Sequence, residues 1–227
     1  MCRYGQVFHI VDTWTRKVCM EKIDFKKTLR YLYQPTAKDF SLVEVPAMQF
    51  VMTDGSGSPA GGDYADAMSW LYSVAYSVKF ASKLDLGRDY TVMPLEGLWW
   101  AEDMDAFATD DKDAWLWTAM IMHPDWIPED MFQAAVKKSV DKLGDPRRSL
   151  RMETVSEGLS VQIMHIGPFA DEAPTIARLH QEYLPEHGLT ENGHHHEIYL
   201  SDPRRTAPEK MKTVIRQPVK RTHRPSN

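Results

Sequence analysis

The chain is poor in cysteine, with only Cys2 and Cys19 among its 227 residues. Both lie ahead of any segment with a core-like apolar pattern, so a disulfide between them would not staple the fold. Two thiols are also too few for a four-thiolate zinc site. We therefore expect reduced cysteines without a structural role.

Long apolar runs are missing as well. No stretch approaches the roughly 18 uninterrupted apolar residues that a membrane span needs, and the opening MCRYGQVFHIVDTWTRK lacks the apolar block of a secretory signal. These absences predict a cytoplasmic protein with no membrane partner.

The chain carries no excess of positive charge, since its formal net charge is -5. The phosphate backbone of nucleic acids attracts clustered Lys and Arg, so we expect no direct nucleic-acid binding. One basic stretch, RQPVKRTHR at 216–224, is expected to run into a solvated tail over 220–227.

The motifs that mark common catalytic and cofactor sites are absent too. The sequence contains no HExxH or CxxC spacing, no glycine-rich phosphate loop and no serine nucleophile elbow. We therefore expect neither a metal nor a cofactor, and we exclude acyl transfer.

What is present is an ordinary core composition, with 43% hydrophobic and 26% charged residues. After an N-terminal extension over 1–35, expected to be partly disordered or non-core, the periodicity predicts one domain over 36–219. Within it, strand, strand, helix, strand, strand occurs twice, at about 40–123 and about 149–219, with a linking helix at about 128–143. This order predicts an α+β fold of duplicated halves with a cleft where the halves meet.

The stretch HHHEIYL near the end of the second half raises the main functional question. Strand alternation places Glu197 and Tyr199 on one face with His195, and Ile198 and Leu200 on the other. We expect the apolar pair to face the helix, which leaves Glu197 between the halves. There it is a pocket acid, a metal ligand beside His195, or a strand-entrance carboxylate paired with Lys or Arg.

A second carboxylate, Glu96 in PLEGLWW, occupies the corresponding strand of the first half. We expect Glu96 and Glu197 to approach one cavity from opposite sides. His165 in QIMHIGPF either faces that cavity or is a hydrogen-bonded core histidine.

Aromatic residues are plentiful, with seven tryptophans in the chain. Each of them is suited to the core, but pairs such as WW and WLW favour an aromatic wall around a flat ligand. Methionines add adaptable apolar surface. The candidate ligand-binding residues are Trp70, Tyr72, Tyr76, Trp99, Trp100, Trp117, Met120, Met122 and Tyr199.

Four segments resemble the GyrI-like small-molecule-binding family: LYSVAYSVKF, YTVMPLEGLWW, GLSVQIMHIGPFADEAPTIARL and HEIYLSDPRRTAPEKMKTVIRQPV. The resemblance covers about 35–219. It implies a duplicated βαββ-type, SHS2-like module with antiparallel sheets, helices on one face and a ligand cleft between the halves. It also implies that Glu197 is the acid of the pocket.

Through its EGLWW and EIYLSDPRR segments, the chain most resembles a subfamily of stand-alone members described as cyclopropanoid cyclopropyl hydrolases. These proteins detoxify DNA alkylators of the yatakemycin and CC-1065 type. In that reaction Glu197 would direct water at the strained ring, and Tyr72 or Tyr76 would donate a hydrogen bond to the carbonyl oxygen. A partly dry pocket would raise the pKa of Glu197. Glu96 would hold a second water or orient the ligand.

Two other functions remain open. The same pocket suits a non-catalytic protein that sequesters or senses drugs. The family name also suggests DNA gyrase as a partner, through the acidic loop EDMDAFATDDKD, although a charge run of this kind usually faces water. We expect a monomer or weak dimer, and the departure of the first 19 residues from the family pattern makes Met20 a possible start.

Overall fold

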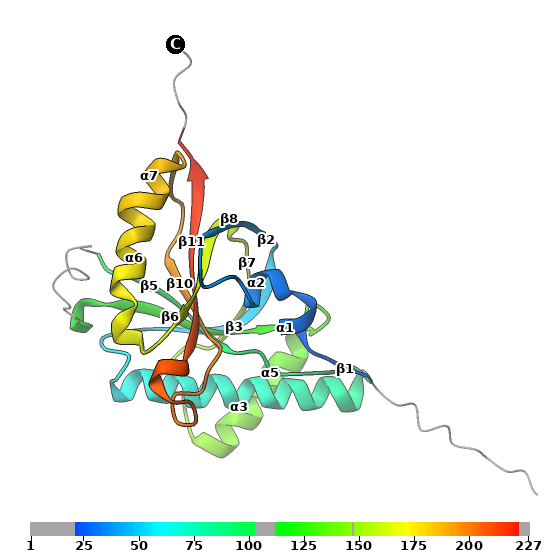
Figure 1. Cartoon of the computed structure of the whole chain (residues 1–227). Helices are drawn as coiled ribbons and strands as arrows, with labels where there is room; N and C mark the ends of the chain where they lie inside the picture. Colours follow the sequence, from blue (N-terminus) through cyan, green and yellow to red (C-terminus); the bar gives the residue numbers. More distant parts are fainter. Residues whose placement is uncertain (1–20, 103–111, 147, 223–227) are drawn as a thin grey trace, which may run out of the picture.

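A computed structural model describes residues 21–102, 112–146 and 148–222. Cys2, Cys19, most of the acidic loop and the last residues of the basic tail lie outside these ranges. The described part is a mixed α+β structure in which one nine-stranded sheet runs through both halves (Figure 1). The helix bounds are α1 Phe25–Thr28, α2 Arg30–Tyr33, α3 Gly62–Asp85, α5 Glu129–Leu143, α6 Ala173–Arg178 and α7 Leu184–Glu186, with a π-helical turn, η3, at Leu179–Tyr183.

The sheet has the order β2-β8-β11-β10-β5-β6-β3-β7, with β9 paired to the end of β11. All pairs in it are antiparallel. The bounds are β2 Ser41–Val45, β3 Met48–Ser56, β5 Leu95–Trp100, β6 Leu116–His123, β7 Arg151–Val155, β8 Gly158–Ile166, β9 Leu189–Glu191, β10 His195–Tyr199 and β11 Lys212–Arg221. Two short strands, β1 Lys22–Ile23 and β4 Asp89–Tyr90, pair separately in parallel.

The two repeats meet edge to edge. Strands β5 and β10 pair with Glu197 opposite Gly97, so the sheet is continuous across the boundary between the halves. The first strand of each repeat is exchanged, because β2 pairs with β8 and β7 pairs with β3. Each half is therefore completed by a strand from the other.

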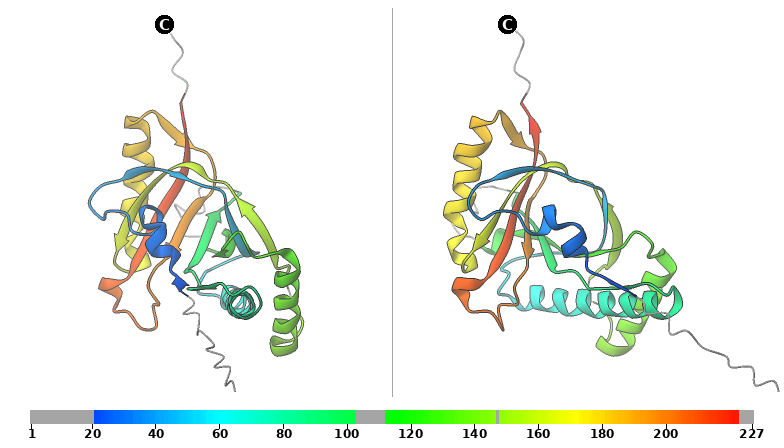
Figure 2. Two further views of the ribbon diagram at one scale, coloured as in Figure 1. Left: turned by 90° about the vertical axis from the view of Figure 1, so that its right-hand side faces the viewer. Right: turned by 45° about the vertical axis from the view of Figure 1, so that its right-hand side comes forward.

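Helix α3 forms because apolar residues recur at spacings of three and four. Leu71, Val74, Ala75 and Val78 are fully buried and pack on β3 and β6. Burial of each large side chain contributes about 1.5–3 kcal/mol. The helix ends before Gly87, whose φ of 65° is in the left-handed region that favours glycine. Helix α5 covers the outer side of α3 (Figure 2).

The helices of both repeats lie on the same face of the sheet. Tyr64 of α3 packs on Trp99 and Trp117, while Leu179 beside α6 packs on Ile215 of β11. By strand alternation this is the face of Glu197, which is opposite Ile215 in the register. The alternation along β10 was predicted, but the expectation that Ile198 faces the helices of the repeats is wrong.

The other face of β10 is covered by the N-terminal helices. Leu32 and Tyr33 of α2 are fully buried in the core cluster that contains Ile198 and Val214, and Figure 2 shows α1 and α2 on this side. The prediction that residues 1–35 are non-core is therefore wrong for this segment. The predicted tail likewise begins too early, because Lys220 still pairs with β9.

Candidate functional site

Glu197 lies on the helical face of β10, near the centre of the sheet. The Tyr199 hydroxyl donates a hydrogen bond of 2.7 Å to its Oε2, and Nε2 of His195 lies 3.3 Å from its Oε1. The indole N–H of Trp99 donates in turn to the Tyr199 hydroxyl over 2.9 Å. About 16% of the Glu197 side chain and 15% of the His195 side chain are exposed, so neither side chain is fully enclosed by the protein.

Gly97 makes this arrangement possible from the neighbouring strand. A Cβ atom there would lie 2.7 Å from Nε1 of Trp99 and 3.2 Å from the Tyr199 hydroxyl. Both side chains therefore use the space that a larger residue would fill. The glycine of EGLWW is explained by this close approach.

The charge on Glu197 is stabilised by its neighbours. Burial alone would raise the pKa of Glu197, but hydrogen bonding and charge from His195, with the hydrogen bond from Tyr199, outweigh it and hold the pKa below its ordinary value. The prediction of a raised pKa is therefore wrong, because the site contains donors as well as aromatic walls. Burial and the charge on Glu197 raise the pKa of Tyr199 well above its ordinary value, so its hydroxyl stays a donor.

Aromatic rings surround this group. The ring of Tyr64 lies 5.5 Å from Trp99 and 5.0 Å from Trp117, and Phe169 packs edge-on against Tyr199 at 5.5 Å. Trp117 is fully buried behind Trp99. Sequence reasoning missed Tyr64, near the start of α3, and Phe169, in the turn before α6.

The tyrosines expected to donate lie at the rim. Tyr72 and Tyr76 are 36% and 51% exposed on α3, with ring centroids 6.4 Å apart. Burial raises the pKa of Tyr72, and the nearby backbone of Leu95, two residues before Gly97 on β5, partly offsets this effect. Tyr72 therefore approaches the strand that pairs with Glu197. Trp70 points into the core from the same helix and is almost fully buried.

Several candidates lie on the opposite face. The register places Glu96 beside Ile198 and Met120, not beside Glu197, so the expected shared cavity for the two carboxylates is wrong. Met122 follows Met120 on that face. Trp100 is there too and stacks on His194, with 4.3 Å between ring centroids. The structure does not bring these residues to Glu197.

His165 lies on the helical face, on β8. Its Nε2 is 3.2 Å from the carbonyl oxygen of Pro168. It also borders a hollow formed with Met164, Thr175 and Arg178. This hollow and a second one, between Phe40 and Tyr183, lie beside α6, and Glu197 lines neither.

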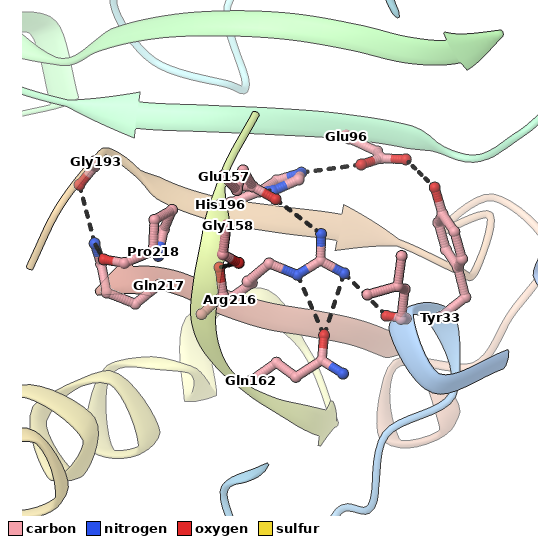
Figure 3. A network of polar contacts seen from close by, with 12 residues as sticks. Tyr33, Glu96, Glu157, Gly158, Gln162, Gly193, His196, Arg216, Gln217 and Pro218 are labelled. Atoms are coloured by element: carbon pink, nitrogen blue, oxygen red, sulfur yellow. Dashed lines mark hydrogen bonds and ion pairs between the residues drawn. The ribbon is translucent and has the colours of Figure 1, made fainter. Parts of the chain in front are cut away.

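A largely buried polar network occupies the opposite face (Figure 3). His196 lies 3.0 Å from Oε2 of Glu96 and 2.8 Å from Oε1 of Glu157. Arg216 donates to the other oxygen of Glu157 over 3.0 Å, and the Tyr33 hydroxyl donates to Glu96 over 3.0 Å. Arg216 also reaches Gln162 and the backbone carbonyl of Leu32.

The charges of this network balance. Burial would lower the pKa of His196, but Glu157 and Glu96 outweigh it and raise the pKa to about 9. Burial would raise the pKa of Glu157, but His196 and Arg216 outweigh it and lower the pKa to about 2. Because every charge has an opposite partner and only Glu157 keeps a small exposed area, the network joins α2 to the sheet and offers little surface for binding.

Within the described ranges, no group of three or more His, Cys, Asp or Glu residues is arranged to hold a metal ion. The described helices also include none that is both long and apolar enough to cross a membrane.

The model of the GyrI-like small molecule binding domain matches residues 38–220. The chain belongs to this family. The match covers both repeats and reaches every strand of the large sheet, ending one residue before the end of β11, whereas α1 and α2 precede it.

Solved structures agree with this assignment. An uncharacterized conserved protein from Listeria innocua is 42% identical, with a TM-score of 0.80 over 88% of this chain and 100% of its own. A protein described as a hydrolase from Listeria innocua is 40% identical, with a TM-score of 0.78 over the same shares. The C-terminal domain of EcmrR, at 11% identity and a TM-score of 0.52 over 81% of this chain and 98% of its own, shows the fold alone. Among curated proteins, none matches the chain significantly.

Proposed function

We propose that this GyrI-like protein is a hydrolase that binds a flat aromatic molecule on the helical face of β10 and opens a cyclopropane ring by adding water. The observation that carries the proposal is the ionised, partly exposed carboxylate of Glu197 among aromatic rings. The Listeria relative described as a hydrolase supports hydrolytic chemistry at 40% identity. The substrate class is a cyclopropane-bearing DNA alkylator of the yatakemycin or CC-1065 type.

In this mechanism Glu197 is the general base. It accepts one proton from water while the water oxygen forms a bond to the strained CH₂ carbon. The ring C–C bond breaks, and its electron pair passes through the conjugated system to the carbonyl oxygen, which takes up a proton from solvent water while Glu197 releases the proton that it accepted. The product is heavier than the substrate by one water, with no other reactant.

Tyr72 is the candidate donor to the carbonyl oxygen. Its hydroxyl lies near the backbone of β5 at Leu95, and burial raises its pKa, which keeps the proton on the oxygen at neutral pH. Trp99 and Tyr199 would hold the flat part of the ligand beside Glu197, which converts binding energy into proximity. Phe169, which is 42% exposed, would cover the ligand from the other side.

Incubation with a cyclopropane-bearing alkylator tests the proposal. Mass spectrometry should detect a product heavier by one water, formed over many turnovers per protein molecule. A stoichiometric complex that contains unchanged ligand would contradict hydrolysis and would leave a drug-sequestering protein.

A further inference from the structure

Glu172 lies where the chain turns into α6. Only 4% of this residue is exposed. Its carboxyl group lies beside that of Glu197, close enough for each to act on the pKa of the other, and the preceding turn places Phe169 against Tyr199. The segment before α6 therefore brings a second, buried carboxyl group onto the candidate reactive acid.

Two adjacent carboxylates repel each other and can only accept hydrogen bonds, so a buried pair of carboxyl groups requires a proton on one of them. Among the described residues, no N–H or O–H group lies in hydrogen-bonding geometry with Oε1 of Glu172, which is buried. Glu197, in contrast, accepts from Tyr199 and contacts His195. Since donors stabilise the charged form, the charge belongs on Glu197 and the proton on Glu172.

The surrounding residues also favour a proton on Glu172 and a negative charge on Glu197. Burial, followed by the charge on Glu197, raises the pKa of Glu172 to about 9. The hydroxyl of Thr213 acts in the opposite sense without reversing it. The groups around the pair are Thr213 on β11, His195 and Tyr199 on β10, Tyr64 on α3, and the exposed Asp171 next to Glu172.

We propose that Glu172 and Glu197 form a carboxylic acid–carboxylate pair, in which Glu172 holds the proton and Glu197 the negative charge. Glu172 is then a positioning residue, because its O–H group orients the Glu197 carboxylate and limits the site to one negative charge. The pair is supported by the burial of Glu172, whose Oε1 has no donor among the described residues, and by the hydrogen bond that Glu197 accepts from Tyr199, whereas its effect on turnover rests on the function proposed above.

Infrared difference spectroscopy tests the pair without any substrate. At neutral pH the wild-type protein should show the carbonyl band of a protonated carboxylic acid, and Glu172→Gln should lose it. Glu182→Gln, at an exposed position beyond α6, is the matched control and should keep the band. A spectrum without this band in the wild-type protein would overturn the proposal.

A titration of the same band keeps the test decisive if Glu172→Gln does not fold. In the wild-type protein the band should disappear as the pH rises through about 9. In Glu197→Gln, which removes the neighbouring charge, the midpoint should fall by at least about one pH unit, equivalent to about 1.4 kcal/mol. An unchanged midpoint would show that Glu172 does not face this charge.

The role in turnover has its own readout. With the cyclopropane substrate, wild-type activity should fall above about pH 9, where Glu172 ionises, and Glu172→Gln should retain activity at that pH. A merely structural role would lower turnover equally at all pH values, which would contradict positioning. If the carbonyl band of Glu172 is present but no turnover is detected, the proposed hydrolysis is contradicted, whereas the Glu172–Glu197 pair is not.

Discussion

The two faces of β10 carry two different histidine–glutamate pairs on adjacent residues. On one face His196 bridges Glu96 and Glu157 with no exposed side-chain surface on the histidine. On the other, His195 and Glu197 remain partly exposed, at a longer distance of 3.3 Å. A closed network with balanced charge holds strands together, whereas an open carboxylate with adjustable partners is available for chemistry.

The largest expected effect comes from breaking the closed network. Arg216→Met leaves Glu157 buried without its guanidinium partner, and we expect a loss of about 3–5 kcal/mol in the free energy of unfolding. Urea denaturation measures it. Arg204→Met, at a side chain that is 86% exposed, should change stability by less than about 0.5 kcal/mol. Equal losses of unfolding free energy in the two variants would show that the buried network contributes no more to stability than an exposed ion pair.

The closed network also predicts how stability depends on pH. The pKa of His196 is raised from 6.5 to about 9, so its contribution is complete below about pH 6.5 and is lost as the pH rises through 9. The pKa of Glu157 is lowered from 4.5 to about 2, so its contribution is lost as the pH falls through 2. Thermal unfolding across this range should show both losses. His196→Gln should abolish the alkaline one, and an unchanged alkaline loss would contradict the assignment.

A smaller effect is expected on the open face from Gly97→Ala. The added Cβ would lie 2.7 Å from Nε1 of Trp99, so Trp99 must move away from Tyr199. We expect a loss of about 1–3 kcal/mol in stability from overpacking and a fall in turnover of about tenfold. Crystallography of the variant should show the indole displaced. Unchanged turnover with a displaced indole would separate Trp99 from the reaction.

The smallest of these effects is expected from Tyr199→Phe, which removes one donor from Glu197. Because a pKa unit corresponds to about 1.4 kcal/mol, the loss of one hydrogen bond to a charged group should raise the pKa of Glu197 by about one unit. The acidic limb of the pH–rate profile should therefore move to higher pH. An unmoved limb would show that Tyr199 does not set the ionisation of this acid.

Strand alternation allowed the faces of β10 to be separated from the sequence, and the motifs around HEIYL identified the family. The sequence did not reveal which face the helices cover, because that depends on the pairing of β5 with β10 across the two repeats. The same pairing sends Glu96 away from Glu197. Glu172 was not predicted because its burial arises only when the turn before α6 packs against β10.

The most direct test compares the same substitution on the two faces. Glu197→Gln should lower turnover of the cyclopropane substrate by at least about 100-fold, the effect of losing a general base, while the free energy of unfolding changes little. Glu96→Gln should show the reverse, with reduced stability and turnover retained in the folded protein. Full turnover in Glu197→Gln would contradict the assignment of the reactive acid to the open face.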